Sequence, residues 1–126
     1  MTKHGSTTNS MKPYSMIEEE LEHNHKAQFV RDNISLVARY MMLAEEAAEV
    51  SQAAAKLARI FEGSNPTPKT TDEAFADLDE EMNDVYLAYE IATGKQFKPE
   101  RNFFKLDRCI DRLCEADDIS YTALAN

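Results

Sequence analysis

Residues 43–60, "LAEEAAEVSQAAAKLARI", decide the fold because they form the middle of a long helix with one apolar face. At about 100° per residue, Val50 and Leu57 fall on the same side of this helix. Glu46 falls inside the apolar stripe and Glu49 lies beside it. The stretch therefore predicts a packing seam, and it raises the question of why acidic side chains border that seam.

The composition of the whole chain favours helices. The 126 residues include only three glycines and no tryptophan, while Ala, Glu and Leu recur. This length allows one domain with a modest core. We expect a flexible polar tail at residues 1–14 and a single all-α domain at residues 15–126.

Capping signals divide the domain into four helices. Ser15, Asp32 and Thr70 are expected N-caps, and Gly63 and Gly94 are expected to end the second and third helices. The expected helices cover residues 15–29, 32–61, 70–93 and 99–116.

Apolar side chains repeat at helical spacing on the last three of these helices. The seams are Leu36, Leu43, Val50, Leu57 and Phe61; Phe75, Leu78, Met82, Val85, Tyr89 and Ala92; and Phe103, Leu106, Ile110 and Leu113. Together with the short first helix, these seams predict a four-helix bundle.

A second acidic pair repeats the arrangement of the first. In "EEMNDV", Glu81 and Asp84 are three residues apart and border the apolar seam of the third helix. Burying several carboxylates together is unfavourable unless they are protonated or a cation lies between them. Oxygen ligands without an accompanying His or Cys favour Mg²⁺, with Mn²⁺ as the alternative ion.

The charge and the apolar pattern exclude several classes of function. A formal charge of −9 is a poor match for the phosphate backbone, so we expect no binding to nucleic acid. No apolar run reaches the roughly 18 residues that a membrane span needs. Cys109 and Cys114 point about 140° apart on one helix and are not expected to pair with each other. We expect a cytoplasmic protein with reduced thiols.

The two acidic motifs together resemble those of a known superfamily. The stretch "LAEEAAEVSQAAAKLAR" followed by "LDEEMNDVYLAY" is similar to the paired EExxE and ExxD motifs of the MazG-like, all-α nucleoside triphosphate pyrophosphohydrolases, which also include dimeric dUTPases and dCTP pyrophosphatases. The resemblance covers about residues 36–113. It implies Mg²⁺-dependent hydrolysis of a nucleoside triphosphate, or its deoxy form, to the monophosphate and pyrophosphate. The implied metal ligands are Glu46, Glu49, Glu81 and Asp84.

Other polar residues near the motifs are candidates for catalysis and substrate binding. Glu45 and Glu80 are candidates for the general base, although each is about 100° around its helix from its motif neighbour. Candidates for phosphate binding are Lys56, Arg59, Lys105 and Arg108. The alternative for the last two is a solvated helix face on which Arg108 pairs with Asp111.

Two departures from the superfamily pattern stand out. Here 31 residues separate Glu49 from Glu81, more than is usual, and Asn83 stands where small residues are common. The resemblance also implies an assembly, so we expect a homodimer or a dimer of dimers. The alternative to the enzyme is a helical oligomerisation or partner-binding module that retains the acidic residues without turnover.

Overall fold

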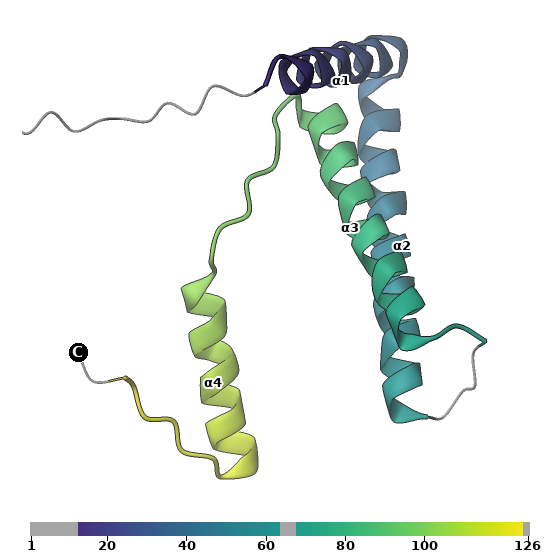
Figure 1. Cartoon of the computed structure of the whole chain (residues 1–126). Helices are drawn as coiled ribbons and strands as arrows, with labels where there is room; N and C mark the ends of the chain where they lie inside the picture. Colours follow the sequence, from purple (N-terminus) through teal and green to yellow (C-terminus); the bar gives the residue numbers. More distant parts are fainter. Residues whose placement is uncertain (1–12, 64–67, 125–126) are drawn as a thin grey trace, which may run out of the picture.

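A computed structural model describes residues 13–63 and 68–124, so the expected tail lies almost wholly outside the described residues. The described chain is all-helical and contains no strand, as expected from the composition. The four helices are α1 (Tyr14–Asn33), α2 (Leu36–Glu62), α3 (Thr71–Thr93) and α4 (Phe103–Asp117) (Figure 1).

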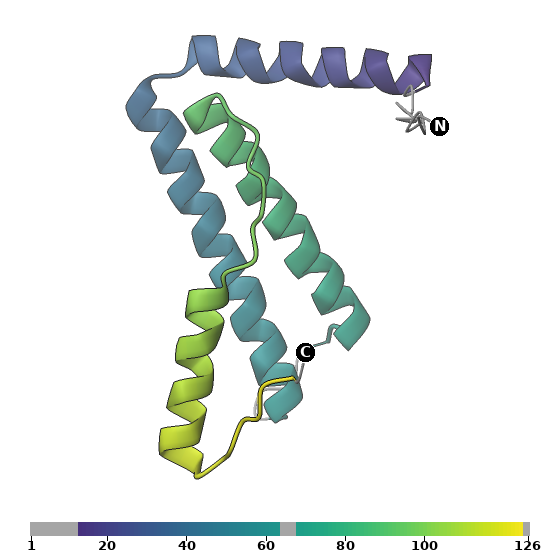
Figure 2. The ribbon, with the colours of Figure 1, turned by 90° about the vertical axis from the view of Figure 1, so that its left-hand side faces the viewer.

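The centre of the fold is an antiparallel hairpin of α2 and α3, which lie side by side along their lengths. Helix α1 crosses the open end of this hairpin and contacts α3 (Figure 2). The buried apolar core of the described chain is small. It consists of Ala27, Leu57, Ala74, Ala88, Ile91 and Ala92. Five of the six lie on the hairpin helices and three of these are alanines, so the two helices bury little bulky side-chain volume.

The seams predicted on the hairpin are only partly buried. Leu57 and Ala92 belong to the core, whereas Leu36 and Phe61 remain mostly exposed. Phe61 contacts the Phe75 ring instead, with the ring centroids 6.0 Å apart. The buried residues of the hairpin therefore lie toward its two ends, Leu57 and Ala74 at one and Ala88, Ile91 and Ala92 at the other, and the acidic motifs lie between them.

Helix caps explain three of the helix boundaries. The Thr70 hydroxyl accepts a hydrogen bond from the Glu73 amide at 3.2 Å, and this confirms the expected start of α3. Gly63 and Gly94 have φ of 73° and 76° and end α2 and α3, also as expected.

Two other expected caps were wrong. The Ser35 hydroxyl, not Asp32, caps α2 and accepts from the Ala38 amide at 3.0 Å. Asp32 lies within α1 and accepts a hydrogen bond from the Gln28 side chain. Ser15 does not cap α1, because the helix already begins at Tyr14, after Pro13.

The start of α4 was also misplaced. The helix begins at Phe103 rather than near Pro99, because the Asn102 side chain accepts from the Lys105 amide at 2.9 Å. Residues 95–102 therefore form an extended connection between α3 and α4.

Arg31 attaches α1 to the end of α3. Its guanidinium donates to the backbone carbonyls of Glu90 at 3.0 Å and Ile91 at 3.2 Å. These carbonyls lie in the last turn of α3, and the Glu90 carbonyl also accepts from the Gly94 amide at 2.8 Å. His23 of α1 also pairs with the Glu90 carboxylate at 2.9 Å. Polar contacts therefore hold α1 in place across the hairpin.

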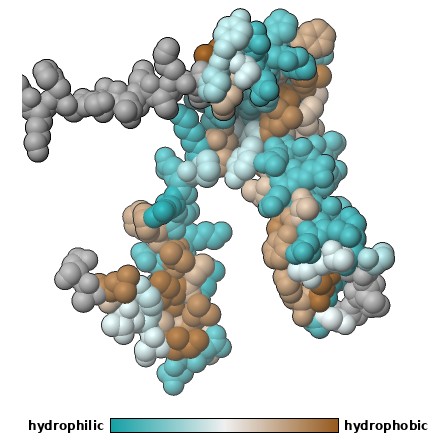
Figure 3. All heavy atoms as spheres, in the orientation of Figure 1, coloured by the Kyte–Doolittle hydropathy of each residue, from teal (hydrophilic) through white to brown (hydrophobic). Residues whose placement is uncertain are grey.

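Helix α4 does not complete a bundle within the single chain. Figure 3 shows open space between α4 and the hairpin, and the extended connection leads the chain away from α3 (Figure 1). Phe103, Leu106 and Leu113 of the predicted seam are 65%, 57% and 51% exposed. The sequence correctly predicted four helices and an apolar stripe on α4, but the packing of that stripe on the chain's own hairpin was wrong.

No helix within residues 13–63 and 68–124 combines the length and the apolar character that crossing a bilayer requires.

Candidate metal centre

Three acidic side chains from two helices meet at the middle of the hairpin. Glu46 comes from α2, and Glu81 and Asp84 come from successive turns of α3. Each offers one carboxylate oxygen, and these oxygens all lie within 4.8 Å of one another. Two oxygens on one Mg²⁺ can be at most about 4.2 Å apart, so small side-chain rotations would let the three share one ion. We refer to these three residues as the acidic cluster.

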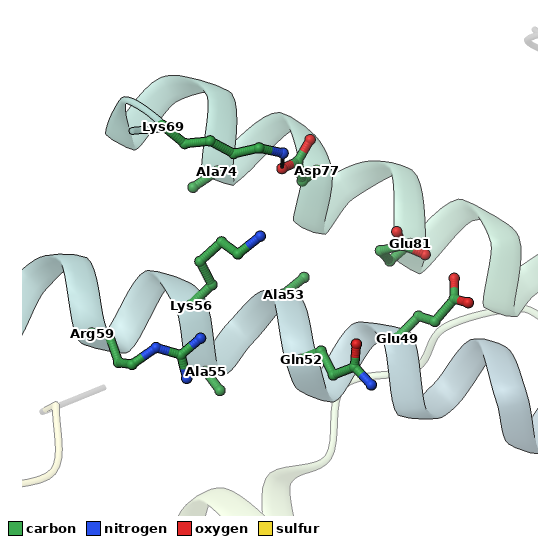
Figure 4. A pocket seen from close by; sticks show the side chains of 10 residues that line it. All are labelled: Glu49, Gln52, Ala53, Ala55, Lys56, Arg59, Lys69, Ala74, Asp77 and Glu81. Atoms are coloured by element: carbon green, nitrogen blue, oxygen red, sulfur yellow. Dashed lines mark hydrogen bonds and ion pairs between the residues drawn. The ribbon is translucent and has the colours of Figure 1, made fainter. Parts of the chain in front are cut away.

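Glu49, the fourth predicted ligand, lies at the edge of the acidic cluster. It faces Glu81 from the opposite helix (Figure 4), and the neighbouring Glu49 carboxyl raises the pKa of Glu81. Two carboxylates that face each other repel unless a proton or a cation lies between them.

The electrostatics of the acidic cluster favour a bound cation. Burial raises the pKa of the Glu46 carboxyl, and the charges of Glu49 and Asp84 raise that pKa further. Burial is also the largest cause of the raised pKa of Glu81, followed by the neighbouring Glu49 carboxyl. In both cases the folded chain disfavours the charged form.

One oxygen of the acidic cluster lacks a partner. Glu81 Oε2 is buried and accepts no hydrogen bond from any described residue. A buried carboxylate oxygen without a donor is unfavourable. A hard cation at this position would satisfy it, and the all-oxygen donor set fits Mg²⁺ or Mn²⁺.

A pocket of about 500 Å³ opens next to the acidic cluster, between α2 and the start of α3 (Figure 4). Its acidic end is formed by Glu49 and Glu81. Its other end carries Lys56, Arg59 and Lys69. The arrangement places cationic groups beside the acidic cluster, which suits an anionic ligand with several phosphates that carries a cation. We refer to it as the cationic pocket.

The predicted phosphate-binding residues separate into two groups. Lys56 and Arg59 line the cationic pocket, and the Lys56 side chain points across it toward α3. Lys105 and Arg108 lie on α4, which does not approach the acidic cluster within this chain (Figure 1). The hairpin itself therefore supplies the cations nearest to the acidic cluster.

The two candidates for the general base stay outside the acidic cluster. Glu45 and Glu80 are exposed, each next to a motif residue. The charge of Glu45 contributes to the raised pKa of Glu46, so Glu45 lies close enough to influence the cluster.

Two residues of the cationic pocket were missed in the sequence. Lys69 directly precedes the cap of α3 and forms an ion pair with Asp77. Asp77 lies four residues before Glu81, so the two share a face of α3. That spacing was a usable signal for Asp77. No sequence signal identified Lys69, because its position in the pocket depends on the path by which the chain enters α3.

Comparisons with known proteins found no matching family model, no matching curated protein and no matching solved structure.

Proposed function

We propose that this protein is a Mg²⁺-dependent nucleoside triphosphate pyrophosphohydrolase. The observation that carries the proposal is the acidic cluster of Glu46, Glu81 and Asp84 beside the cationic pocket. The motif resemblance supports it independently. A housekeeping role in the nucleotide pool fits this activity.

Each group of the site has a place in the reaction. Glu46, Glu81 and Asp84 would hold the ion, with Glu49 at its edge. The ion supplies charge neutralisation and lowers the pKa of a bound water. Lys56 and Arg59 bind and orient the phosphate oxygens in the cationic pocket.

The hydrolysis consumes one water molecule. The water oxygen forms a bond to the α-phosphorus as the bond from that phosphorus to the bridging oxygen breaks. Pyrophosphate leaves, and a carboxylate accepts the water proton. Glu45 and Glu80 remain the predicted candidates for that carboxylate.

A pair of matched variants tests the proposal. Asp84→Asn removes a carboxylate of the acidic cluster, whereas Asp79→Asn makes the same change at an exposed position of α3. We expect metal-dependent pyrophosphate release from at least one triphosphate in a panel of ribo- and deoxynucleotides. Asp84→Asn should lower kcat/KM by about 100-fold or more, and Asp79→Asn should leave it within about twofold.

The alternative function is a helical interaction module. The apolar side chains exposed on α2 and α4 favour it. If no triphosphate in the panel releases pyrophosphate and calorimetry detects no Mg²⁺ binding, the module replaces the enzyme. The same release rate in both variants would also remove the acidic cluster from the mechanism.

A further inference from the structure

Helix α4 carries an apolar stripe that the described residues leave largely exposed. At about 100° per residue, a sector about 140° wide contains Phe103, Leu106, Cys109, Ile110, Leu113 and Cys114. We refer to this sector as the α4 stripe. A 15-residue helix is marginal in water without a surface to pack against. Since the hairpin of its own chain stands away from α4 (Figure 3), the covering surface must come from elsewhere.

Helix α2 has an uncharged outer face that the described part of the chain also leaves exposed. Between Val37 and Ala58, a sector about 120° wide contains these two residues, Tyr40, Met41, Ser51 and four further alanines, and all of them are exposed. We refer to this sector as the alanine face. The outer face of a helix in a water-soluble hairpin ordinarily carries charged side chains. An uncharged face about 32 Å long therefore indicates a surface that another helix covers.

The two surfaces complement each other in size. The α4 stripe is made of bulky side chains, and most of the alanine face is made of small ones. Bulky side chains on one helix pack closely against small ones on another because the helix axes can approach. From Phe103 to Cys114 and from Val37 to Ala58, neither surface carries a charged residue, so this contact would bury no unpaired ion. Asp117, the last residue of α4, falls in the same sector as the α4 stripe, but it lies at the exposed end of the helix.

We propose that α4 of each chain packs its stripe on the alanine face of a second copy. A twofold dimer makes this contact twice and leaves neither surface uncovered. A helix of this length covers on the order of 220 Å² on its partner. Counting both helices of both contacts gives about 900 Å², most of the roughly 1,200 Å² at which specific interfaces begin.

The small buried core of the single chain agrees with packing of α4 on a second copy. Six buried residues, four of them alanine, leave the chain short of apolar burial for its length. The proposal does not depend on the proposed enzymatic activity, because it concerns residues outside the acidic cluster and, apart from Ala55, outside the cationic pocket.

Cross-linking of the full chain distinguishes packing of α4 on a second copy from packing of α4 within its own chain. In Cys114→Ser, a benzophenone maleimide on Cys109 reports what the α4 stripe touches. Chains labelled with ¹⁴N and ¹⁵N are mixed, equilibrated and irradiated. Trypsin releases the target as one peptide, Tyr40–Lys56, which spans most of the alanine face. We expect cross-links to this peptide that join the two isotopes.

Three results of this experiment overturn the proposal. Cross-links that are all isotopically pure place α4 on its own hairpin. Mixed cross-links confined to other peptides place it on a different surface of the second copy. An absence of cross-links together with a monomeric mass by light scattering also rejects it.

A matched pair of substitutions tests the orientation of α4. Leu106→Asp puts a charge in the α4 stripe, whereas Phe104→Asp adds the same charge on the opposite side of the helix. We expect Leu106→Asp to weaken dimerisation at least tenfold by sedimentation equilibrium and Phe104→Asp to leave it unchanged. The circular dichroism of both variants should retain α1, α2 and α3. An unchanged dimer in Leu106→Asp, or equal loss in both variants, contradicts the proposal.

Discussion

The Glu81 carboxyl lies among other acidic groups, and its Oε2 atom accepts no hydrogen bond from the described chain. Replacing Glu81 with Gln removes a negative charge from the acidic cluster. In EDTA we expect Glu81→Gln to melt a few degrees above wild type, because the repulsion with Glu49 is relieved. Thermal melts followed by circular dichroism measure the difference.

The same variant should respond differently to metal. Wild type should gain thermal stability in Mg²⁺, and Glu81→Gln should gain less, because it lacks one ligand. Glu80→Gln, at the exposed neighbouring position, is the control and should behave like wild type in both buffers. A Glu81→Gln melt that lies below wild type in EDTA would mean that Glu81 contributes packing rather than strain.

The pH dependence of the metal-free protein follows from the two raised pKa values. The folded chain holds protons on Glu46 and Glu81 more tightly than the unfolded chain does, since both pKa values lie above the ordinary 4.5. The unfavourable contribution of these groups is absent below 4.5 and develops as the pH rises through their raised values. The double variant Glu46→Gln/Glu81→Gln is compared with wild type in EDTA. We expect the difference between their melting temperatures to grow as the pH rises over this range. A difference that is constant with pH would contradict the shifts.

The individual residues of the site were partly predictable. Glu46, Glu81 and Asp84 could be found because helical spacing fixes which side chains share a face, and the seam fixes which faces meet. Lys69 could not be found, since its position depends on the path by which the chain enters α3. Lys105 and Arg108 were assigned to the site on the expectation that α4 packs on its own hairpin.

At the scale of the elements, the contact between α1 and the end of α3 depends on Arg31. The guanidinium donates two hydrogen bonds to backbone carbonyls in the last turn of α3. We expect Arg31→Met to lower the free energy of unfolding by about 1.5–3 kcal/mol, the range for hydrogen bonds from charged donors. Urea denaturation measures it, with the exposed Arg112→Met as a control that changes little.

The helix caps show where local sequence is sufficient. Thr70, Gly63 and Gly94 were predicted because each is the sole strong signal at its boundary. Asp32 and Ser35 are both good N-cap residues three positions apart, so propensity alone could not choose between them. In the structure Ser35 is the cap, because Asp32 still lies inside α1. This length of α1 includes Arg31, which contacts the end of α3.

At the scale of the whole molecule, burial is concentrated in the hairpin and absent from α4. At concentrations at which light scattering gives a monomeric mass, we expect the amides of α4 to exchange hydrogen fastest among the four helices. The middle of α2 and α3 should exchange slowest, because its opening requires separation of the hairpin. Mass spectrometry of deuterated peptides measures this order. Equal protection of α4 and α2 in the monomer would mean that α4 packs within the chain.

The fold class was predictable from composition and periodicity, but the placement of α4 was not. An apolar stripe states only that a helix needs a partner surface, and it does not say which chain supplies it. The apolar seams of the last three helices therefore indicated one closed bundle. In the single chain, α2 and α3 form an open hairpin and α4 stands apart from it.

The acidic cluster, the cationic pocket and both capped ends of the hairpin all lie between Ser35 and Gly94. These 60 residues are one uninterrupted segment of the chain. A single recombination event could therefore transfer the whole set of chemical groups to another host protein, since functional sites can be grafted between folds. Inheritance of the chemistry would then be independent of the two outer helices, which are free to diverge in sequence between lineages.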